Sequence, residues 1–140
     1  MEGKIDTDLI AAFETIAGTK SDEDTLRADL EALAKLLDEV PAKLDAPSLV
    51  FRGRDGAVRV VPVGEELSCG RGVGCQLRFP ELREISRRHF TVVKEENIYW
   101  LRDQGSFNGT KIRGRPVKNH ELRNGDLINA AGIIFGFVRE

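Results

Sequence analysis

The sequence has few of the residues that build metal centres and covalent active sites. Its 140 residues include two cysteines, Cys69 and Cys75, and two histidines, His89 and His120. The cysteines do not form a CxxC pair, and the histidines are not spaced like the ligands of a zinc module. We therefore expect two reduced thiols, as in a cytosolic protein, with no metal and no cofactor.

Long apolar runs and catalytic signatures are also missing. There is no run of 18 or more apolar residues, and the N-terminal stretch 1–6 is polar, so we expect a cytoplasmic protein with no membrane partner. We find no HExxH motif and no nucleophile–base pair supported by glycines. The stretch 70–74 is glycine-rich but lacks the Lys-Ser/Thr of a phosphate-binding P-loop. The sequence predicts a protein that is not an enzyme.

The charges are distributed unevenly along the chain. Residues 1–47 hold 12 acids and 5 bases, a balance of −7, whereas residues 48–140 hold 11 acids and 16 bases, a balance of +5. A basic part attracts anionic partners, and here an acidic segment is tethered to it. Nucleic acid is one such partner, and a phosphorylated peptide suits this modest charge equally well.

Apolar residues recur at helical intervals before the prolines of the 41–47 stretch. Residues 6–17 form one such segment, and residues 18–20 predict a turn. A second segment begins with an N-cap at Ser21 and ends at Pro41. We therefore expect an acidic helical hairpin and linker over residues 1–47. The apolar positions are Leu9, Ile10, Phe13 and Ile16 in the first helix, and Leu26, Leu30, Leu33, Leu37 and Val40 in the second.

The apolar stripe of the second helix leaves two uses open. It covers barely two heptads, which favours packing of the helices on their own domain over a coiled coil. The alternative is a docking surface for a partner, with the helical hairpin mediating self-association.

After Pro47 the pattern changes to short runs rich in Val, Ile, Phe and Tyr, separated by Gly, Asn and Pro. Many short strands with no long helix between them predict a mainly β protein, a β-sandwich, over residues 48–140. The expected strands are Ser48–Arg52, Ala57–Val63, Glu65–Cys69, His89–Lys94, Ile98–Arg102, Arg115–Val117, Asp126–Asn129 and Ile133–Val138.

Three loops between these strands carry residues suited to an anion. Gly70-Arg71 combines a backbone that can approach a ligand closely with a planar fork of donors that matches a phosphate. The segment Ser86–His89 places a hydroxyl and two guanidiniums directly before a strand. The segment Asn108–Thr110 favours a tight turn, and its amide can both donate to and accept from a peptide backbone. Each motif alone is a weak signal, but their order and spacing form a specific combination.

This combination resembles the forkhead-associated (FHA) family. The later segment Leu122–Ile128 is similar to that family's turn and strand near the C-terminus. The resemblance covers roughly residues 48–140. It implies an FHA-type β-sandwich of about eleven short strands, whose loops at one end bind phosphothreonine peptides.

The resemblance also implies a role for each matching residue. Arg71 would pair with the phosphate, and Ser86 would hydrogen-bond a phosphate oxygen through its hydroxyl. Arg87 would make another peptide or phosphate contact, and Arg88 would brace the loop or face solvent. Asn108 would bind the peptide main chain beside the phosphothreonine. The residues expected to support the site are His89, as a brace of the loop, and Gly70 and Gly109, as backbone requirements.

One position departs from the family's pattern. The residue before Asn108 is commonly Thr or Ser in the family, and that hydroxyl can help to hold the phosphate. Here it is Phe107. The Phe107 backbone N–H would still serve, and Ser106 would compensate. We expect a working site with weaker affinity or an altered preference.

The predicted function is a phosphothreonine-dependent protein–protein interaction module that acts downstream of a Ser/Thr kinase. One alternative is a phosphate-independent FHA-like scaffold or oligomerisation domain. Nucleic-acid binding is the less favoured alternative, because the pI is about 5.8 and the aromatic residues Tyr99, Trp100 and Phe107 are expected to lie in strands.

Thr7 and Thr19 are candidate phosphoacceptors in the acidic segment. Each is followed three positions later by an Asp or an aliphatic residue, which FHA domains often prefer. The phosphorylated segment would then bind its own Arg71 site or that of a neighbouring molecule. The alternative is that both threonines are ordinary helix-end residues.

Overall fold

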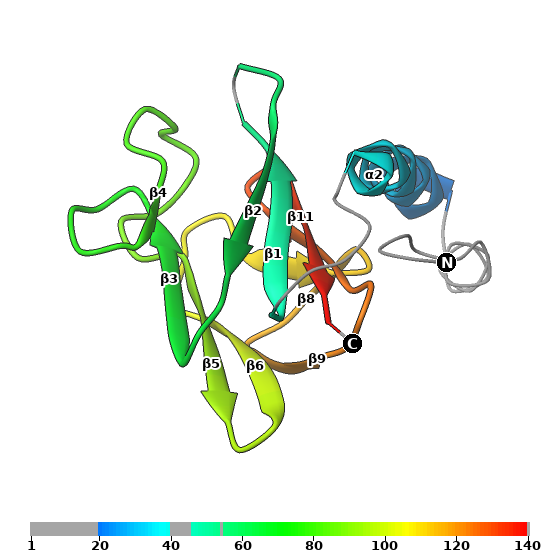
Figure 1. Ribbon diagram of the computed structural model, residues 1–140. Helices are drawn as coiled ribbons and strands as arrows, with labels where there is room; N and C mark the ends of the chain where they lie inside the picture. Colours follow the sequence, from blue (N-terminus) through cyan, green and yellow to red (C-terminus); the bar gives the residue numbers. More distant parts are fainter. Residues whose placement is uncertain (1–19, 40–45, 54, 140) are drawn as a thin grey trace.

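The computed structural model describes residues 20–39, 46–53 and 55–139. Eleven strands in this part of the chain form two sheets, which pack as a β-sandwich with a helix outside them (Figure 1). The prediction of a β-sandwich with about eleven short strands is confirmed. The described residues contain one N-terminal helix and not the expected hairpin, whose first helix, residues 6–17, lies outside the described residues.

The two sheets have six and five strands. The six-stranded sheet, called sheet A, has the order β2-β1-β11-β10-β7-β8, and sheet B has the order β4-β3-β5-β6-β9. Paired strands are antiparallel except β3 and β4, which run parallel. Sheet A consists of β1 (Ser48–Arg52), β2 (Val58–Pro62), β7 (Thr110–Ile112), β8 (Arg115–Pro116), β10 (Leu127–Ala130) and β11 (Ile133–Val138). Sheet B consists of β3 (Glu66–Gly70), β4 (Leu77–Arg78), β5 (Phe90–Glu95), β6 (Ile98–Asp103) and β9 (Asn119–Leu122).

Eight of these strands were predicted from the sequence to within one residue at each end, and β1 and β11 match at both ends. The sequence missed β4, β7 and β9. The first two are only two and three residues long, too short for an alternating pattern. Strand β9 begins with Asn119, His120 and Glu121, so composition alone does not distinguish it from a loop.

Strands β1 and β11 lie inside sheet A and bury residues on both faces. Leu49 and Phe135 point into the core between the sheets, whereas Val50 and Gly136 face the other way, toward α2 (Lys20–Asp38). Burial on both faces explains why these strands are nearly continuous apolar runs and do not alternate with polar residues.

The helix α2 lies on the outer face of sheet A beside β11 and β1 (Figure 1). A Cβ atom on Gly136 would lie 2.7 Å from Cδ1 of Leu33, so the glycine lets the helix approach the sheet closely. The contact confirms the prediction that the apolar stripe packs on its own domain. Its buried residues are Leu30, Leu33, Leu36 and Leu37 of the helix with Val50 and Leu127 of the sheet.

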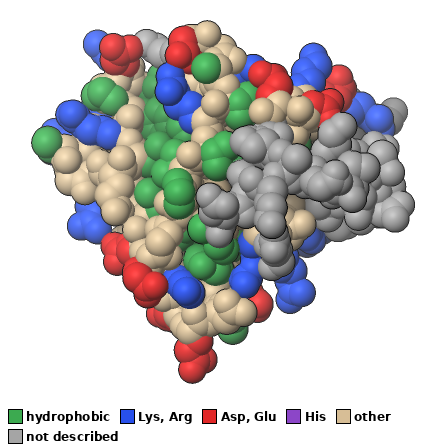
Figure 2. Space-filling model, in the orientation of Figure 1, with side chains coloured by type: hydrophobic (Ala, Val, Ile, Leu, Met, Phe, Trp, Pro, Cys, Tyr) green, Lys and Arg blue, Asp and Glu red, His purple; other side chains and the backbone are tan. Residues whose placement is uncertain are grey.

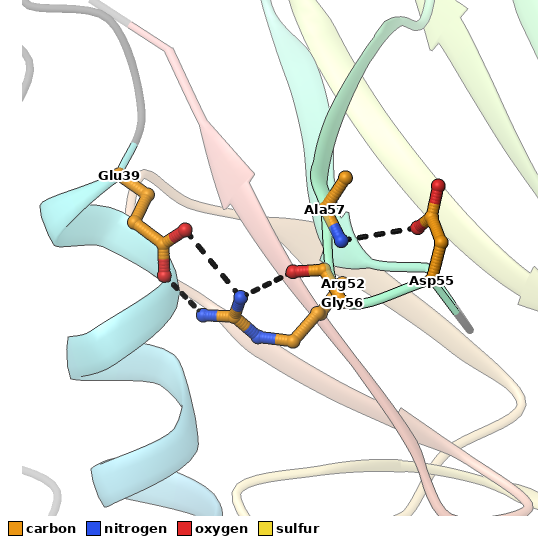
Figure 3. Close-up of polar contacts among 5 residues, drawn as sticks. All are labelled: Glu39, Arg52, Asp55, Gly56 and Ala57. Carbon is orange, nitrogen blue, oxygen red and sulfur yellow. Dashed lines mark hydrogen bonds and ion pairs between the residues drawn. The ribbon is translucent and has the colours of Figure 1, made fainter.

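Both ends of the helix differ slightly from the prediction. The helix begins at Lys20, so Ser21 lies within it and is not its N-cap. It ends at Asp38. Arg52, at the end of β1, pairs with both carboxylate oxygens of the next residue, Glu39, and also donates to the Gly56 carbonyl at 2.6 Å (Figure 3). The turn between β1 and β2 is therefore tied to the C-terminal end of the helix. No helix in the described residues is both long enough and apolar enough to cross a membrane.

A band of hydrophobic side chains runs down the middle of the face shown in Figure 2, in the region of β1 and β2, with charged side chains beside it. Strand β2 is an edge of sheet A, and its three valines are only half-buried. Arg59 and Pro62 on the same strand are exposed. A charge and a proline on an edge strand hinder pairing with another chain.

Candidate functional site

The three loop motifs meet beyond the end of β3. The backbone N–H of Arg71 donates to the Ser86 carbonyl at 2.9 Å, and that of Gly72 donates to the Arg87 carbonyl at 3.0 Å. From the third loop, the backbone N–H of Phe107 donates to Oγ of Ser86 at 2.9 Å. Ser86 therefore contacts both of the other loops, and the fold brings together the residues that the sequence singled out.

Gly70 is a glycine because the loops approach each other closely. A Cβ atom at this position would lie 2.3 Å from the carbonyl oxygen of Arg87 and 2.9 Å from Sγ of Cys75. Cys75 itself donates its thiol to the Arg87 carbonyl at 3.1 Å. Any side chain on Gly70 would push the Ser86–Arg87 segment away from the end of β3.

Arg71 is held in place by contacts with backbone atoms and with Arg78, and these contacts leave its two terminal nitrogens available as donors. Its Nε–H donates to the Ile85 carbonyl at 3.0 Å, and its own carbonyl accepts from Nε of Arg78 at 3.2 Å. The side chain is half-buried, and its two terminal nitrogens have no partner among the described residues. A guanidinium fixed at Nε with both terminal amino groups unpaired is suited to bidentate binding of an anion.

The hydrogen bond that Ser86 accepts determines what its hydroxyl can do. Oγ already accepts the Phe107 N–H, so the hydroxyl proton remains available to donate to a ligand. The same bond engages the Phe107 N–H, which we expected from the sequence to donate to the phosphate. In this geometry Phe107 supports Ser86 through its backbone.

His89 joins two loops from a fully buried position. Its Nδ1 accepts the backbone N–H of Ser86 at 3.1 Å, and its Nε2 lies 2.9 Å from the Gly109 carbonyl. Because an N–H points at Nδ1, we assign the ring proton to Nε2, which then donates to Gly109. Gly109 has φ +83°, a conformation that favours glycine. This arrangement suits a structural brace.

Asn108 is exposed, and its side chain is half engaged. Its Nδ2 donates to the Glu84 carbonyl at 2.8 Å. Its Oδ1 has no partner among the described residues and is free to accept from a peptide N–H. The amide is thus oriented by the protein with its acceptor unpaired.

Phe107 stands where the family commonly has Thr or Ser. It lies on a loop and is 93% exposed. The interpretation that all three aromatic residues lie in strands was therefore wrong for Phe107, although Tyr99 and Trp100 do lie in β6. Ser106 was expected to compensate for the missing hydroxyl. Its Oγ donates to Oδ1 of Asp103 at 2.5 Å, so that donor is already engaged.

Asp103 organises the Phe107 loop, and the sequence analysis missed it. Besides Ser106, its carboxylate accepts from Oγ1 of Thr110 at 2.8 Å and from the backbone N–H groups of Gly105 and Ser106. Partial burial acts to raise the pKa of this carboxyl, but these hydrogen bonds outweigh it and hold the pKa below its ordinary value. The signal was present as an Asp two residues before a glycine, a common Asx-turn spacing.

Arg87 and Arg88 are exposed beside the site, and their guanidiniums have no partner in the described part of the chain.

Cys69 and Cys75 are buried free thiols, as predicted, and burial raises the pKa of Cys69. No three His, Cys, Asp or Glu side chains of the described residues gather as a metal site would require. Thr7 and Thr19 lie outside the described residues.

Comparison with known proteins identifies this arrangement. The family model described as FHA domain matches residues 67–131. The chain is 35% identical over 82 residues to FHA domain-containing protein FhaA of Mycobacterium tuberculosis, covering 58% of this chain and 15% of that protein. It is also 35% identical over 74 residues to the E3 ubiquitin-protein ligase CHFR of Danio rerio, covering 49% of this chain and 12% of that one. The chain thus spans a small part of the curated relatives it matches.

Solved structures agree with this assignment. The FhaA FHA domain in complex with the intracellular domain of Rv3910 superposes with a TM-score of 0.56 at 27% identity, covering 66% of this chain and 99% of that one. A structure from a study of phosphothreonine-dependent FHA domain interactions gives a TM-score of 0.55 at 26% identity, with 66% and 97% covered. Together with the fold and the three converging loops, these matches show that residues 67–131 of the chain form an FHA domain.

Proposed function

We propose that this chain binds phosphothreonine-containing segments of other proteins and acts by binding alone, downstream of a Ser/Thr kinase. One observation carries the proposal. Among the described residues, the terminal nitrogens of Arg71 and the hydroxyl proton of Ser86 are donors without a partner, and the hydrogen bond from Arg71 N to the Ser86 carbonyl joins the two loops that carry them. A phosphothreonine carries about −1.5 to −2 charge at neutral pH, which suits such a set of donors.

The remaining site residues have complementary roles in this proposal. The exposed guanidinium of Arg87 adds positive charge beside the phosphate, and Oδ1 of Asn108 accepts an N–H from the peptide main chain. His89, Gly70 and Gly109 keep the loops at the right spacing. Phe107 brings no hydroxyl, so we expect a weaker or differently selective site than one with Thr or Ser there.

An oriented phosphothreonine-peptide library tests the proposal directly. Wild-type protein should select phosphothreonine peptides over the unphosphorylated set, and Arg71→Ala should lose this selection. Loss of the charged hydrogen bonds of Arg71 should cost about 1.5–3 kcal/mol, roughly one to two decades in affinity. Arg123→Ala is the matched control. Arg123 is an exposed arginine directly after β9, whose last residue, Leu122, pairs with Tyr99 near the start of β6. The candidate site lies beyond the other end of β6, after Asp103.

A phosphate-independent scaffold would behave differently in the same experiment. Binding of a protein partner would then be unchanged by Arg71→Ala and by phosphatase treatment of the partner. Equal binding of both peptide sets by folded wild-type protein would contradict phosphothreonine recognition.

The ligand could also come from the same chain. Phosphorylated Thr7 or Thr19 would supply a phosphothreonine within the acidic segment, and Thr19 immediately precedes α2, which is packed on sheet A. After kinase treatment, this proposal predicts a change in hydrodynamic size or reduced binding of a free phosphopeptide. No change in either quantity would leave an external cytoplasmic protein as the partner.

A further inference from the structure

A cavity of about 440 Å³ lies beside the proposed phosphate site. Its wall includes Gly72 and Arg87, the residues that directly follow Arg71 and Ser86. The hydrogen bond from Gly72 N to the Arg87 carbonyl joins these two segments at 3.0 Å. A peptide bound at Arg71 and Ser86 therefore has this cavity within reach of its neighbouring residues.

The cavity carries more positive than negative charge. Arg87 and Arg88 both line it, and Glu66 is the one carboxylate among the lining residues. Neither guanidinium makes an ion pair or hydrogen bond within the described residues. Elsewhere in the sandwich, Arg102 pairs with Glu95, and Arg113 pairs with Asp126. Two unpaired guanidiniums on one cavity are the arrangement expected of an anion site.

The lining of the cavity also includes Gln76, a neutral donor of fixed orientation. Oε1 of Gln76 accepts the backbone N–H of Ser68 at 3.0 Å, and the Gln76 backbone N–H donates to Oγ of Ser68 at 3.1 Å. The first bond orients the carboxamide, so its Nε2 is the end left without a partner in the described part of the chain, and the second bond holds the Gln76 backbone beside Ser68. Gly74 also lines the cavity, and a Cβ added there would meet none of the described residues within 4 Å, so there is room for a ligand.

We propose that this cavity is a second anion subsite, which binds an acidic group of the same phosphopeptide near its phosphothreonine. Arg88 supplies the charge that distinguishes this subsite, with Arg87 shared between the two anions and Gln76 as the neutral donor. The acidic group is a carboxylate side chain or a second phosphoryl group, which share the chemistry that a guanidinium recognises. The inference rests on the proposed function, because the first phosphate delivers the second anion to the cavity.

The test is an acidic scan around one phosphothreonine in an otherwise alanine peptide. Glu, its neutral control Gln, or phosphoserine is placed in turn at each position within about five residues on either side. Affinities are measured for wild type, Arg88→Ala and Arg123→Ala. At one or two adjacent positions, wild type should bind the acidic peptide about threefold to tenfold more tightly than the Gln peptide. A gain with Glu identifies a carboxylate site, and a gain with phosphoserine alone identifies a phosphate site.

The variants separate this inference from the proposed function. Arg88→Ala should abolish the gain while leaving the affinity for the all-alanine phosphothreonine peptide unchanged, and Arg123→Ala should keep both. A gain that persists in Arg88→Ala, or no gain at any position, would overturn the subsite while phosphothreonine binding stands. If wild type binds no phosphothreonine peptide, the proposed function fails and the subsite fails with it.

Discussion

The hydroxyl oxygen of Ser86 accepts the backbone N–H of Phe107 at 2.9 Å, across 21 residues of sequence. This bond does not depend on the side chain at position 107, which is 93% exposed. A change of that side chain should therefore alter ligand contacts and leave the loop and the fold intact.

Phe107→Thr tests whether a hydroxyl at this position strengthens binding. We expect phosphothreonine-peptide affinity to rise by about two- to tenfold, the value of one added hydrogen bond of 0.5–1.5 kcal/mol. Phe107→Ala is the control, with unchanged affinity, and both variants should keep the wild-type melting temperature. If Phe107→Ala weakens binding instead, the ring itself contacts the peptide. Isothermal titration calorimetry with one peptide would measure all three proteins.

Gly70→Ala should destabilise the protein and weaken peptide binding together. The new methyl group would lie 2.3 Å from the Arg87 carbonyl oxygen, and overpacking of this kind costs about 1–3 kcal/mol. For a chain of this size the melting temperature should fall by about 3–4 °C per kcal/mol. Gly74→Ala, four residues on in the loop that follows β3, is the matched control because its methyl group would meet none of the described residues within 4 Å. Similar melting temperatures for the two variants would contradict the close approach.

Asp103 should give the stability a dependence on acid pH. Its hydrogen bonds hold its folded-state pKa below the ordinary value, so its stabilising contribution is fully present above the unfolded pKa of about 3.9. That contribution is lost as the pH falls through the folded pKa. Asp103→Asn should therefore unfold at lower urea than wild type at pH 6, and the difference should shrink below about pH 4. A difference that is constant with pH would show that the carboxylate charge is not what matters.

Gly136 and Leu33 should be energetically coupled. Leu33→Ala alone removes a fully buried side chain and should cost about 2–5 kcal/mol. Gly136→Ala alone forces a methyl group against Leu33 Cδ1 at 2.7 Å. In the double variant the space left by Leu33 accommodates that methyl group, so its cost should be less than the sum of the two. Pairing Gly136→Ala with Leu37→Ala, in the same cluster, should give a smaller coupling, and equal couplings would argue against a direct contact. Urea unfolding measures the free energies.

The sequence predicted the parts of the fold that depend on local pattern. Strands β1 and β11 were placed correctly because their β-branched and aromatic runs are flanked by turn residues. The helix stripe was predicted without Leu36, because a helix packed on a flat sheet buries a wider face than a strict heptad seam.

The sequence also singled out three loops that come together in the structure, but it did not predict how their polar groups are hydrogen-bonded. The cavity lined by Gln76 and Arg88 depends on contacts between segments far apart in the chain, which spacing alone does not encode. Likewise, the hydrogen bond from the Phe107 N–H to Ser86 follows from tertiary placement. A sequence motif therefore identifies the potential donors, whereas the folded structure determines which of them already have a hydrogen-bond partner.

The packing of α2 on sheet A sets a practical limit on how this protein can be cut. The sequence placed a domain boundary at residue 48, and the family match begins later still, at residue 67. A recombinant fragment that starts at Ser48 would lack α2 and would expose Val50, Leu127 and Gly136 to water. Such a fragment would expose a new apolar patch and would be prone to aggregate. Its failure in a binding assay would therefore not test the loops of the candidate site. Peptide-binding work on this protein should retain the residues from Lys20 onward.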